Sequence, residues 1–298
     1  MNAKGQPIRV LRDVDAMSGK DLQLSIDVGV QLQAAEILRR GQLEPAELGS
    51  LQVQRALSKN IELQAHIALG DDLVLRDAKD RLVPPESGAI VVMDIHSGEV
   101  ISLVSAPMFD PNLFTRTLLT RDWRRLNSHP RTPLLNRATS GQYAPGSTFK
   151  MVVGLAAIEA GVISKDTQFY CSGDMELGNA TFHCWRKGGH GMMNIISALE
   201  QSCDVFIYEV ALKTGIRKIK DMAHRLGLGD VTGIGLPGEK QGIIPSHEWK
   251  LVNQGGVWTP GETVVSSIGQ GYVLATPLQL AVMTCLLYTS DAADDGLS

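Results

Sequence analysis

The sequence predicts a mixed α/β (α+β) domain in which helices pack on a sheet. β-Branched runs at residues 88–95 and 100–105 flank a turn signal at 96–99, a pattern typical of a β-hairpin. Apolar, helix-compatible segments follow at 148–160 and 201–212. Strands mixed with apolar helices over roughly 200 residues are typical of helices packed on one sheet, which gives the fold class.

The region before the hairpin predicts a strand, a helix and an insertion. Residues 22–26 alternate like a short strand, and Asp27 can cap a helix that follows it. Residues 41–84 are polar and helical in pattern, and we expect them to form an insertion or connector. The apolar residues expected on one face of the helix after Asp27 are Val28, Leu32, Ala35 and Leu38.

The composition is globular and mildly acidic. The chain has 298 residues, of which 44% are hydrophobic and 20% charged, so wholesale disorder is excluded. The formal net charge is -4, and a nucleic-acid-binding protein usually carries a basic excess, so no nucleic-acid partner is expected. The longest apolar stretch, 151–163, contains Glu159 and is too short to cross a bilayer.

Two further segments have a distinctive composition. Residues 116–137 are rich in arginine, which favours a solvated helix face, with guidance of an anionic substrate as the alternative. Residues 227–263 are rich in Gly and Pro, and we expect loops with short strands there.

A Ser-x-x-Lys motif at Ser147 and Lys150 provides a candidate nucleophile. Pro145-Gly146 breaks the chain before the serine and an apolar helix follows. Ser147 is therefore expected at a helix N-terminus, with Lys150 one turn later on the same face. A serine hydroxyl needs a base to take its proton, and burial favours the neutral lysine that can serve as that base. The alternative is a helix cap followed by an ordinary surface lysine.

A second motif, Ser202-Cys203-Asp204, opens the predicted helix at 201–212. Ser-x-x-Lys, Ser-Asp-Asn and Lys-Thr-Gly together form the signature of penicillin-recognising serine enzymes, and this triplet has the related form Ser-x-Asp. The hydroxyl of Ser202 can relay a proton between a lysine and a leaving group. The carboxylate of Asp204 can accept a hydrogen bond from a lysine or a substrate amide.

Several motifs, in order along the chain, resemble the penicillin-binding protein 2 family, the transpeptidases of the rod-elongation machinery in Gram-negative bacteria. The resemblance runs from about residue 20 to 284 and implies the penicillin-binding-protein transpeptidase or serine β-lactamase-like fold. The matching motifs are Asn136-Arg137-Ala138, Tyr143 to Lys150, Gly189-His190-Gly191, Ser202-Cys203-Asp204, Thr232 to Glu239, Gly269-Gln270-Gly271-Tyr272 and Ala275-Thr276-Pro277.

The resemblance implies a peptidoglycan D,D-transpeptidase. Ser147 would attack the D-Ala–D-Ala carbonyl of a stem peptide, D-Ala would leave, and an amine of a neighbouring stem peptide would resolve the acyl-enzyme into a cross-link. Lys150, Ser202 and Asp204 would assist, and backbone N–H groups, including that of Ser147, would hold the oxyanion. β-Lactams would trap the same serine. The implied partners are a SEDS-type membrane glycan polymerase and other elongation proteins, on the periplasmic side of the inner membrane.

Other interpretations stay open. A division-type transpeptidase is the nearest, although the Cys/His cluster and Ser-Cys-Asp would be unusual there. A class D β-lactamase-like enzyme also uses Ser-x-x-Lys, but water resolves its acyl-enzyme. A non-catalytic penicillin-binding-like scaffold belongs to another class, and the absence of a Lys-[Ser/Thr]-Gly motif favours it.

The nearest string to that third motif is Lys240-Gln241-Gly242, whose middle residue lacks a hydroxyl. We therefore expect the 298-residue chain to be inactive or nearly so, and the family's membrane anchor to be missing from it. The expected organisation is the end of a pedestal or linker region at 1–26, a connector with a helical insertion at 27–87, an incomplete transpeptidase domain at 88–284 and a non-native tail at 285–298. For residues 285–298, a genuine acidic terminus is the alternative.

Cys171, Cys184, His190 and Cys203 follow the spacing C-x12-C-x5-H-x12-C. Three thiolates and an imidazole form the closed tetrahedral set that zinc prefers in structural sites. The resemblance implies the same, because members of the family bind zinc through ligands at matching positions. We expect one structural Zn²⁺, with His183 as an alternative ligand. A Cys171–Cys184 disulfide and buried free thiols are the other possibilities.

Overall fold

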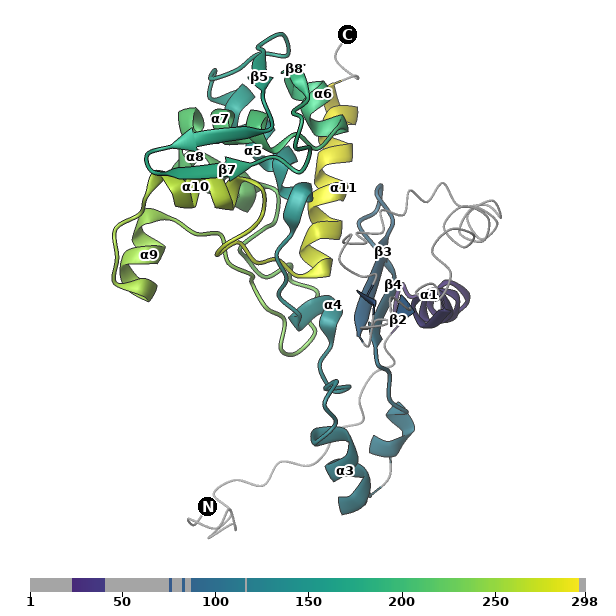
Figure 1. Ribbon diagram of the computed structural model, residues 1–298. Coiled ribbons are helices and arrows are strands. Elements are labelled where there is room, and N and C mark those ends of the chain that lie inside the picture. The colour runs from purple at the N-terminus through teal and green to yellow at the C-terminus, as the bar shows by residue number, and fades with distance from the viewer. Residues whose placement is uncertain (1–22, 41–74, 77–81, 84–86, 116, 295–298) are drawn as a thin grey trace, which may run out of the picture.

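The computed structural model describes residues 23–40, 75–76, 82–83, 87–115 and 117–294. They form a body of helices and short strands and, beside it, a β-hairpin that carries one helix (Figure 1). Most of the expected insertion at 41–84 and the expected boundary region before residue 23 lie outside the described residues.

The elements have the following bounds. The helices are α1 (Val28–Arg40), α3 (Thr120–Asn127), α4 (Arg137–Ser140), α5 (Lys150–Glu159), α6 (Ile195–Glu200), α7 (Asp204–Thr214), α8 (Ile216–Arg225), α9 (His247–Gln254), α10 (Pro260–Ser267) and α11 (Pro277–Asp294), with 3-10 helices η2 (Pro111–Phe114) and η3 (Gly146–Phe149). The strands are β1 (Leu75–Arg76), β2 (Leu82–Val83), β3 (Gly88–Met93), β4 (Val100–Ala106), β5 (Phe169–Cys171), β6 (Asp174–Leu177), β7 (Ala180–His183) and β8 (Gly191–Met193).

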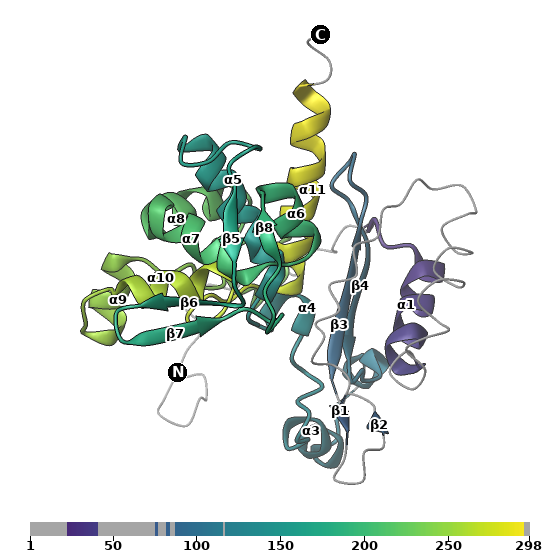
Figure 2. The same ribbon diagram turned by 45° about the horizontal axis from the view of Figure 1, so that its top comes forward.

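The predicted hairpin is confirmed. Strands β3 and β4 pair antiparallel, with Gly88 opposite Ala106 and an irregularity between Val92 and Met93. Helix α1 packs against this hairpin, and α11 contacts β3 from the opposite side (Figure 2). The remaining strands form three further two-stranded pairs, β1–β2, β5–β8 and β6–β7, so the described strands build hairpin-sized units rather than one broad sheet.

Helix α1 begins as the sequence predicts, but its buried face differs. The carboxylate of Asp27 accepts a hydrogen bond from the amide of Val30 at 2.9 Å, which caps the helix. Ala34 and Leu38 are buried against β3 and β4, whereas Val28 and Leu32 are more than 60% exposed. The expected face was therefore wrong for Val28 and Leu32, because the hairpin covers the adjoining side of the helix.

The expected strand at 22–26 is not formed by the residues described there. Residues 23–27 lie beside β4, where the amide of Asp27 donates to the carbonyl of Ile101 at 3.0 Å. Ser25 Oγ donates to the carbonyl of Val100 at 2.8 Å. These contacts fix the segment beside β4 without the repeated backbone pairing that defines a strand.

Helix α7 forms the centre of the body. It packs against α5, α8, α10 and β5, and its residues from Asp204 to Tyr208 are all buried. A helix that is apolar nearly all round belongs in a core, which explains why its sequence shows no polar face. It begins at Asp204 rather than at Gln201, because α6 ends at Glu200 and a short turn separates the two helices.

The Gly- and Pro-rich segment at 227–263 contains helix α9 and the start of α10, where the sequence led us to expect loops and short strands. Each helix has an N-terminal cap. Ser246 Oγ accepts from the amide of Trp249, and Thr259 forms a capping box with Glu262 around Pro260 at the first turn. These local signals outweigh the composition of the segment.

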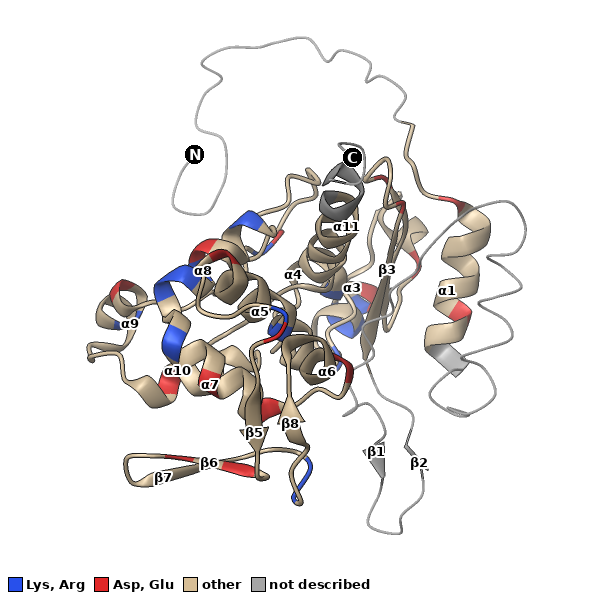
Figure 3. Cartoon of the chain, turned by 90° about the horizontal axis from the view of Figure 1, so that it is seen from above, with Lys and Arg blue, Asp and Glu red and all other residues tan. Residues whose placement is uncertain are grey.

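The arginine-rich segment behaves mainly as a solvated surface. Arg121, Arg124 and Arg125 are exposed on α3, and Figure 3 shows charged residues on this helix. Arg137 is the exception, since it is 6% exposed and its guanidinium donates to the carbonyl of Arg131 at 2.6 Å. Among the described helices, none has the length and apolar character needed to cross a membrane.

Candidate active site

Ser147 lies in an exposed turn at the start of η3, immediately before α5. The segment leading to it is held by a backbone bridge, in which Tyr143 and Ala275 exchange two hydrogen bonds of 2.9 Å. Phe149 is buried beneath the turn at 1% exposure. The hydroxyl of Ser147 is therefore accessible to a ligand on a fixed backbone, as the motif predicts.

Lys150 is the most deeply buried charged residue of the site, with 1% of its surface exposed. Its Nζ donates to Asp204 Oδ1 at 2.6 Å, to Ser202 Oγ at 2.9 Å and to the carbonyl of Ser202 at 2.8 Å. Three acceptors satisfy the three N–H bonds of an ammonium, so the buried charge is fully hydrogen bonded. Lys150 is not the ordinary surface lysine of the alternative interpretation.

Ser202 connects the two motifs. Its Oγ donates to Ser147 Oγ at 2.9 Å and accepts from Lys150 Nζ. Along the described chain, the hydrogen-bonded path between Ser147 and Lys150 thus passes through Ser202 rather than directly. Ser202 also has φ = 52°, a left-handed conformation that costs energy for a residue with a side chain.

Asp204 is held from two sides. Its Oδ1 binds Lys150, and its Oδ2 accepts from the backbone amide of Trp185 at 2.9 Å. The indole of Trp185 donates in turn to the carbonyls of Gln201 and Ser202 at 3.1 Å. Sequence reasoning did not identify Trp185, because its place beside the Ser-Cys-Asp turn arises from tertiary packing.

The turn at Gly269 also contacts the site. Its sequence motif was identified, but its contact with the segment before Ser147 was not predicted. The amide of Gly146 donates to the carbonyl of Gly269 at 3.0 Å. Gly269 has φ = 68°, and a Cβ there would collide with the carbonyl oxygen of Gly146. The turn after α10 therefore packs directly behind the residue that precedes Ser147.

The predicted Cys/His set comes together next to Ser202, which Cys203 directly follows. One potential ligand atom from each of Cys171, Cys184, His190 and Cys203 lies within 4.8 Å of the others. Cys171 Sγ and Cys184 Sγ are 3.6 and 3.5 Å from His190 Nδ1. The cysteines are present as free thiols, and His183 is exposed and outside the cluster.

The two Cys–His separations match those expected around a tetrahedral zinc ion. Bonds of about 2.3 Å to sulfur and 2.0 Å to nitrogen place the two donors about 3.5 Å apart at a tetrahedral angle, close to the observed separations. Burial raises the pKa of the Cys203 thiol to about 12, and burial together with Arg186 lowers the pKa of His190. His190 Nε2 is buried and has no hydrogen-bond partner among the described residues.

Two other features lie apart from this site. In Lys240-Gln241-Gly242, the amide of Lys240 donates to the carbonyl of Thr139, so this string supports the fold rather than the nucleophile.

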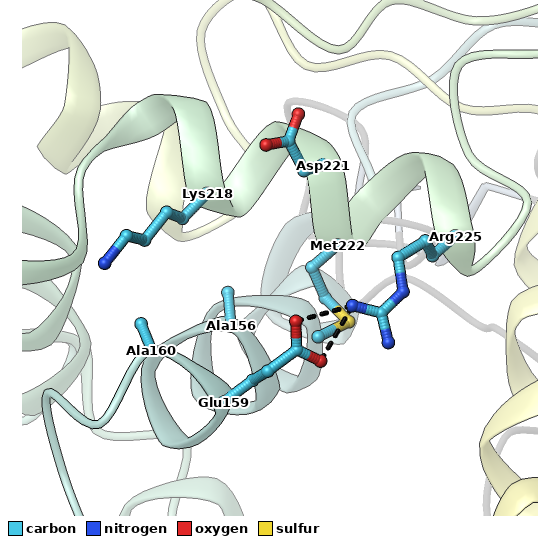
Figure 4. Close-up of a pocket in the computed structure, with 7 residues that line it drawn as sticks. All are labelled: Ala156, Glu159, Ala160, Lys218, Asp221, Met222 and Arg225. Atoms are coloured by element: carbon cyan, nitrogen blue, oxygen red, sulfur yellow. Dashed lines mark hydrogen bonds and ion pairs between the residues drawn. The ribbon is translucent and has the colours of Figure 1, made fainter.

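A cavity of about 260 Å³ lies between α5 and α8, beside the Glu159–Arg225 ion pair (Figure 4). Glu159 follows Lys150 by more than two helical turns, so the cavity is about 13 Å further along α5.

Comparisons with known proteins agree with this geometry. The profile of the penicillin binding protein transpeptidase domain matches residues 88–289. Peptidoglycan D,D-transpeptidase MrdA of Escherichia coli (strain K12) is 39% identical over 218 residues, which are 72% of this chain and 34% of the relative. The chain thus spans about a third of the length of this curated relative.

Solved structures give the same result. Pseudomonas aeruginosa PBP2 in complex with WCK 5153 is 39% identical, with a TM-score of 0.65 over 68% of this chain and 46% of that chain. PBP2 of Helicobacter pylori, in a complex with MreC, is 38% identical, with a TM-score of 0.67 over 69% of this chain and 39% of that chain. The predicted resemblance and fold class are confirmed, and the chain belongs to the penicillin binding protein transpeptidase family.

Proposed function

We propose that this chain carries the acylating serine and its proton relay for a peptidoglycan D,D-transpeptidase of the cell-elongation type. One observation carries the proposal, namely the continuous hydrogen bonding from Ser147 through Ser202 to Lys150 and Asp204. If Ser147 served only as a helix cap, Lys150 would not need to be buried one turn later. Relatives named peptidoglycan D,D-transpeptidase MrdA support the type of reaction.

The relay assigns a role to each side chain. Acylation requires Lys150 as a neutral amine, so its ammonium first loses a proton to solvent. The two hydroxyls then turn, so that Ser147 donates to Ser202 and Ser202 donates to Lys150. Lys150 takes the Ser147 proton through Ser202 Oγ while Ser147 Oγ bonds to the carbonyl carbon of the terminal D-Ala–D-Ala bond. The same path then returns the proton to the departing amine of D-Ala. Asp204 orients Lys150, and the backbone N–H of Ser147 at the helix start is a donor for the oxyanion.

The wider assignments are part of the same proposal. The substrates are stem peptides, and β-lactams acylate the same serine, which the penicillin G acyl-enzyme complex of penicillin-binding protein A from M. tuberculosis supports. A PBP2 complex with MreC and a peptidoglycan synthase complex support elongation proteins and a glycan polymerase as partners. The proposed location is the periplasmic face of the inner membrane, where these substrates are cross-linked.

The reaction is tested with the complete gene product and a pentapeptide stem donor. We expect release of D-Ala and, with an acceptor amine, a cross-linked product, both lost in Ser147→Ala. Release that is insensitive to Ser147→Ala would refute the proposal. Rapid hydrolysis of β-lactams without peptide cross-linking would favour a β-lactamase-like enzyme, and no turnover at all would favour a scaffold.

We also propose one structural Zn²⁺ held by Cys171, Cys184, His190 and Cys203. The fit of the donor set supports it, as does the buried, closed environment. Cys203 lies between Ser202 and Asp204, and Cys184 precedes Trp185, so ligation would fix both ends of the hydrogen bonds around Asp204. Zinc would supply folding energy here and no chemistry at the serine.

Elemental analysis of the reduced, folded protein measures the metal directly. We expect one zinc per chain, lost in Cys171→Ser and retained in the control Cys285→Ser, whose thiol lies in α11 away from the cluster. Stoichiometric zinc in Cys171→Ser, or no zinc in the unaltered protein, would refute the site. Peptide mapping that finds a Cys171–Cys184 disulfide would favour that alternative.

A further inference from the structure

Three aromatic rings meet at the edge of the body, beside the turn that packs behind Ser147. The ring of Tyr272 lies 5.1 Å from the ring of Trp249 and 6.5 Å from that of Trp258, centre to centre, with interplanar angles near 50°. Such separations are typical of attractive aromatic pairs. We call Trp249, Trp258 and Tyr272 the aromatic brace. It joins α9, which lies beside α10 in Figure 1, to the chain after α10.

The brace is anchored by buried polar contacts. Trp258 is 8% exposed, and its indole donates to Thr263 Oγ1 at 2.8 Å. Lys250 on α9 forms an ion pair of 2.5 Å with Glu262 on α10, and both side chains are less than 20% exposed. The ion pair therefore links α9 to α10. It lies one residue after Trp249 and so helps to place the Trp249 ring beside Tyr272.

Tyr272 directly follows the turn that touches the nucleophile segment. The carbonyl of Gly269 accepts the amide of Gly146, the residue before Ser147, at 3.0 Å. Gly269 and Gly271 both have φ = 68°, and glycine itself does not restrict the backbone to one conformation. On the α10 side, the amide of Gly269 donates to the carbonyl of Ser266 at 3.0 Å. On the other side the turn is followed by Tyr272 and the buried Val273, so the packing of Tyr272 is one of the contacts that set the position of the Gly269 carbonyl.

We propose that Trp249 is a positioning residue for acylation, acting through Tyr272 and the Gly269–Gly271 turn on the backbone of Gly146 and Ser147. It contacts no reacting atom. Its ring limits the movement of Tyr272, and the turn then presents a fixed acceptor to the Gly146 amide. The inference rests on the proposed function, since it concerns how fast Ser147 is acylated.

The test compares Trp249→Ala and Trp249→Phe with the unaltered complete gene product. Stopped-flow acylation by a chromogenic cephalosporin separates the dissociation constant of the first complex from the acylation rate constant. For Trp249→Ala we expect the rate constant to fall about three- to tenfold, the effect of losing one aromatic pair, with the dissociation constant unchanged. Trp249→Phe restores most of the rate. Val252→Ala is the matched control, since Val252 is 81% exposed on the same helix.

Hydrogen exchange supplies a second measurement that does not depend on activity. In Trp249→Ala, and in the bulkier Trp249→Leu if the first variant folds poorly, we expect faster exchange at the Gly146 amide with unchanged exchange in α7. Equal acylation and equal Gly146 exchange in Trp249→Ala would overturn the inference, as would a loss that Trp249→Phe does not rescue. If the unaltered protein is not acylated at Ser147, the proposed function fails, and the exchange data alone decide on the brace.

Discussion

Removing the carboxylate of Asp204 should destabilise the protein strongly, because it leaves a buried cation without its counter-ion. Lys150 has 1% of its side chain exposed, and its 2.6 Å contact with Asp204 is its shortest hydrogen bond. Breaking a buried ion pair from one side costs about 3–5 kcal/mol. The Asp204 side chain is 12% exposed, so water can partly replace it, and we expect a loss near the lower end of that range, about 3 kcal/mol.

The assay is urea unfolding of Asp204→Ala followed by circular dichroism. With a typical urea dependence of about 1–3 kcal/mol per molar, a loss of this size shifts the midpoint by about 1–3 M. The double variant Lys150→Met, Asp204→Leu should recover a large part of the stability, because no charge is then buried alone. Arg225→Ala is the surface control, since its partner Glu159 is 56% exposed, and it should leave the urea midpoint nearly unchanged.

A loss below about 1 kcal/mol in Asp204→Ala would refute this reasoning, because it would mean that the lysine is either uncharged or well solvated without the carboxylate. A double variant that is less stable than Asp204→Ala would also contradict it. In that case the packing of the two side chains, rather than their charge, would dominate the stability of the site.

Three further outcomes are expected. Gly269→Ala should lower the melting temperature, because the new Cβ would collide with the carbonyl of Gly146 at a positive φ; an unchanged melting temperature would contradict the close packing. Asn194→Ala should cost about 1 kcal/mol in urea unfolding, because its side chain accepts the Ser197 amide in the capping box of α6, and Asn194→Ser should restore most of it. Burial alone would raise the pKa of Glu262, but hydrogen bonds led by that from Lys250 hold it below its usual 4.5. A carboxyl group whose pKa is lower in the folded than in the unfolded protein stabilises the fold at pH values above its usual pKa. This contribution is lost as the pH falls through the folded-state pKa, so Lys250→Met should destabilise the protein more at pH 7 than at pH 3.

The position of the candidate nucleophile Ser147 was predictable because the local sequence signals and the topology agree there. The Pro-Gly break before Ser147 and the apolar segment after it place the serine at a helix start, and the Ser-x-Asp triplet stands at the start of a second helix. Packing of α5 against α7 brings these two starts together. The path from Ser147 to Lys150 through Ser202 was less predictable, since it depends on the left-handed turn at Ser202.

The supporting residues could not be found from the sequence. Trp185 reaches Asp204 only because the loop after β7 folds over the start of α7, and Gly269 reaches Gly146 across a long sequence separation. The buried face of α1 depends on which side the hairpin covers. Periodicity marks the apolar positions of a helix but does not decide which of two adjoining faces finds a partner.

The cysteine cluster was only partly predictable from the sequence. The residue types suggested a tetrahedral donor set, but the spacing has no tight C-x2-C pair to fix its geometry. Pairing of β5 with β8 sets Cys171 opposite Gly191, beside His190, and the start of α7 adds Cys203. The chemistry could therefore be proposed from composition, while the convergence of the four side chains required the structure.

The central claim is that Ser147 is the residue acylated by penicillin, and peptide mapping after treatment of the complete gene product tests it most directly. We predict one covalent benzylpenicillin per molecule, located on Ser147 and absent from Ser147→Ala. The relay variant Ser202→Ala, which interrupts the path to Lys150, should be labelled more slowly at the same residue. Labelling at another serine, or undiminished labelling of Ser147→Ala, would contradict the account.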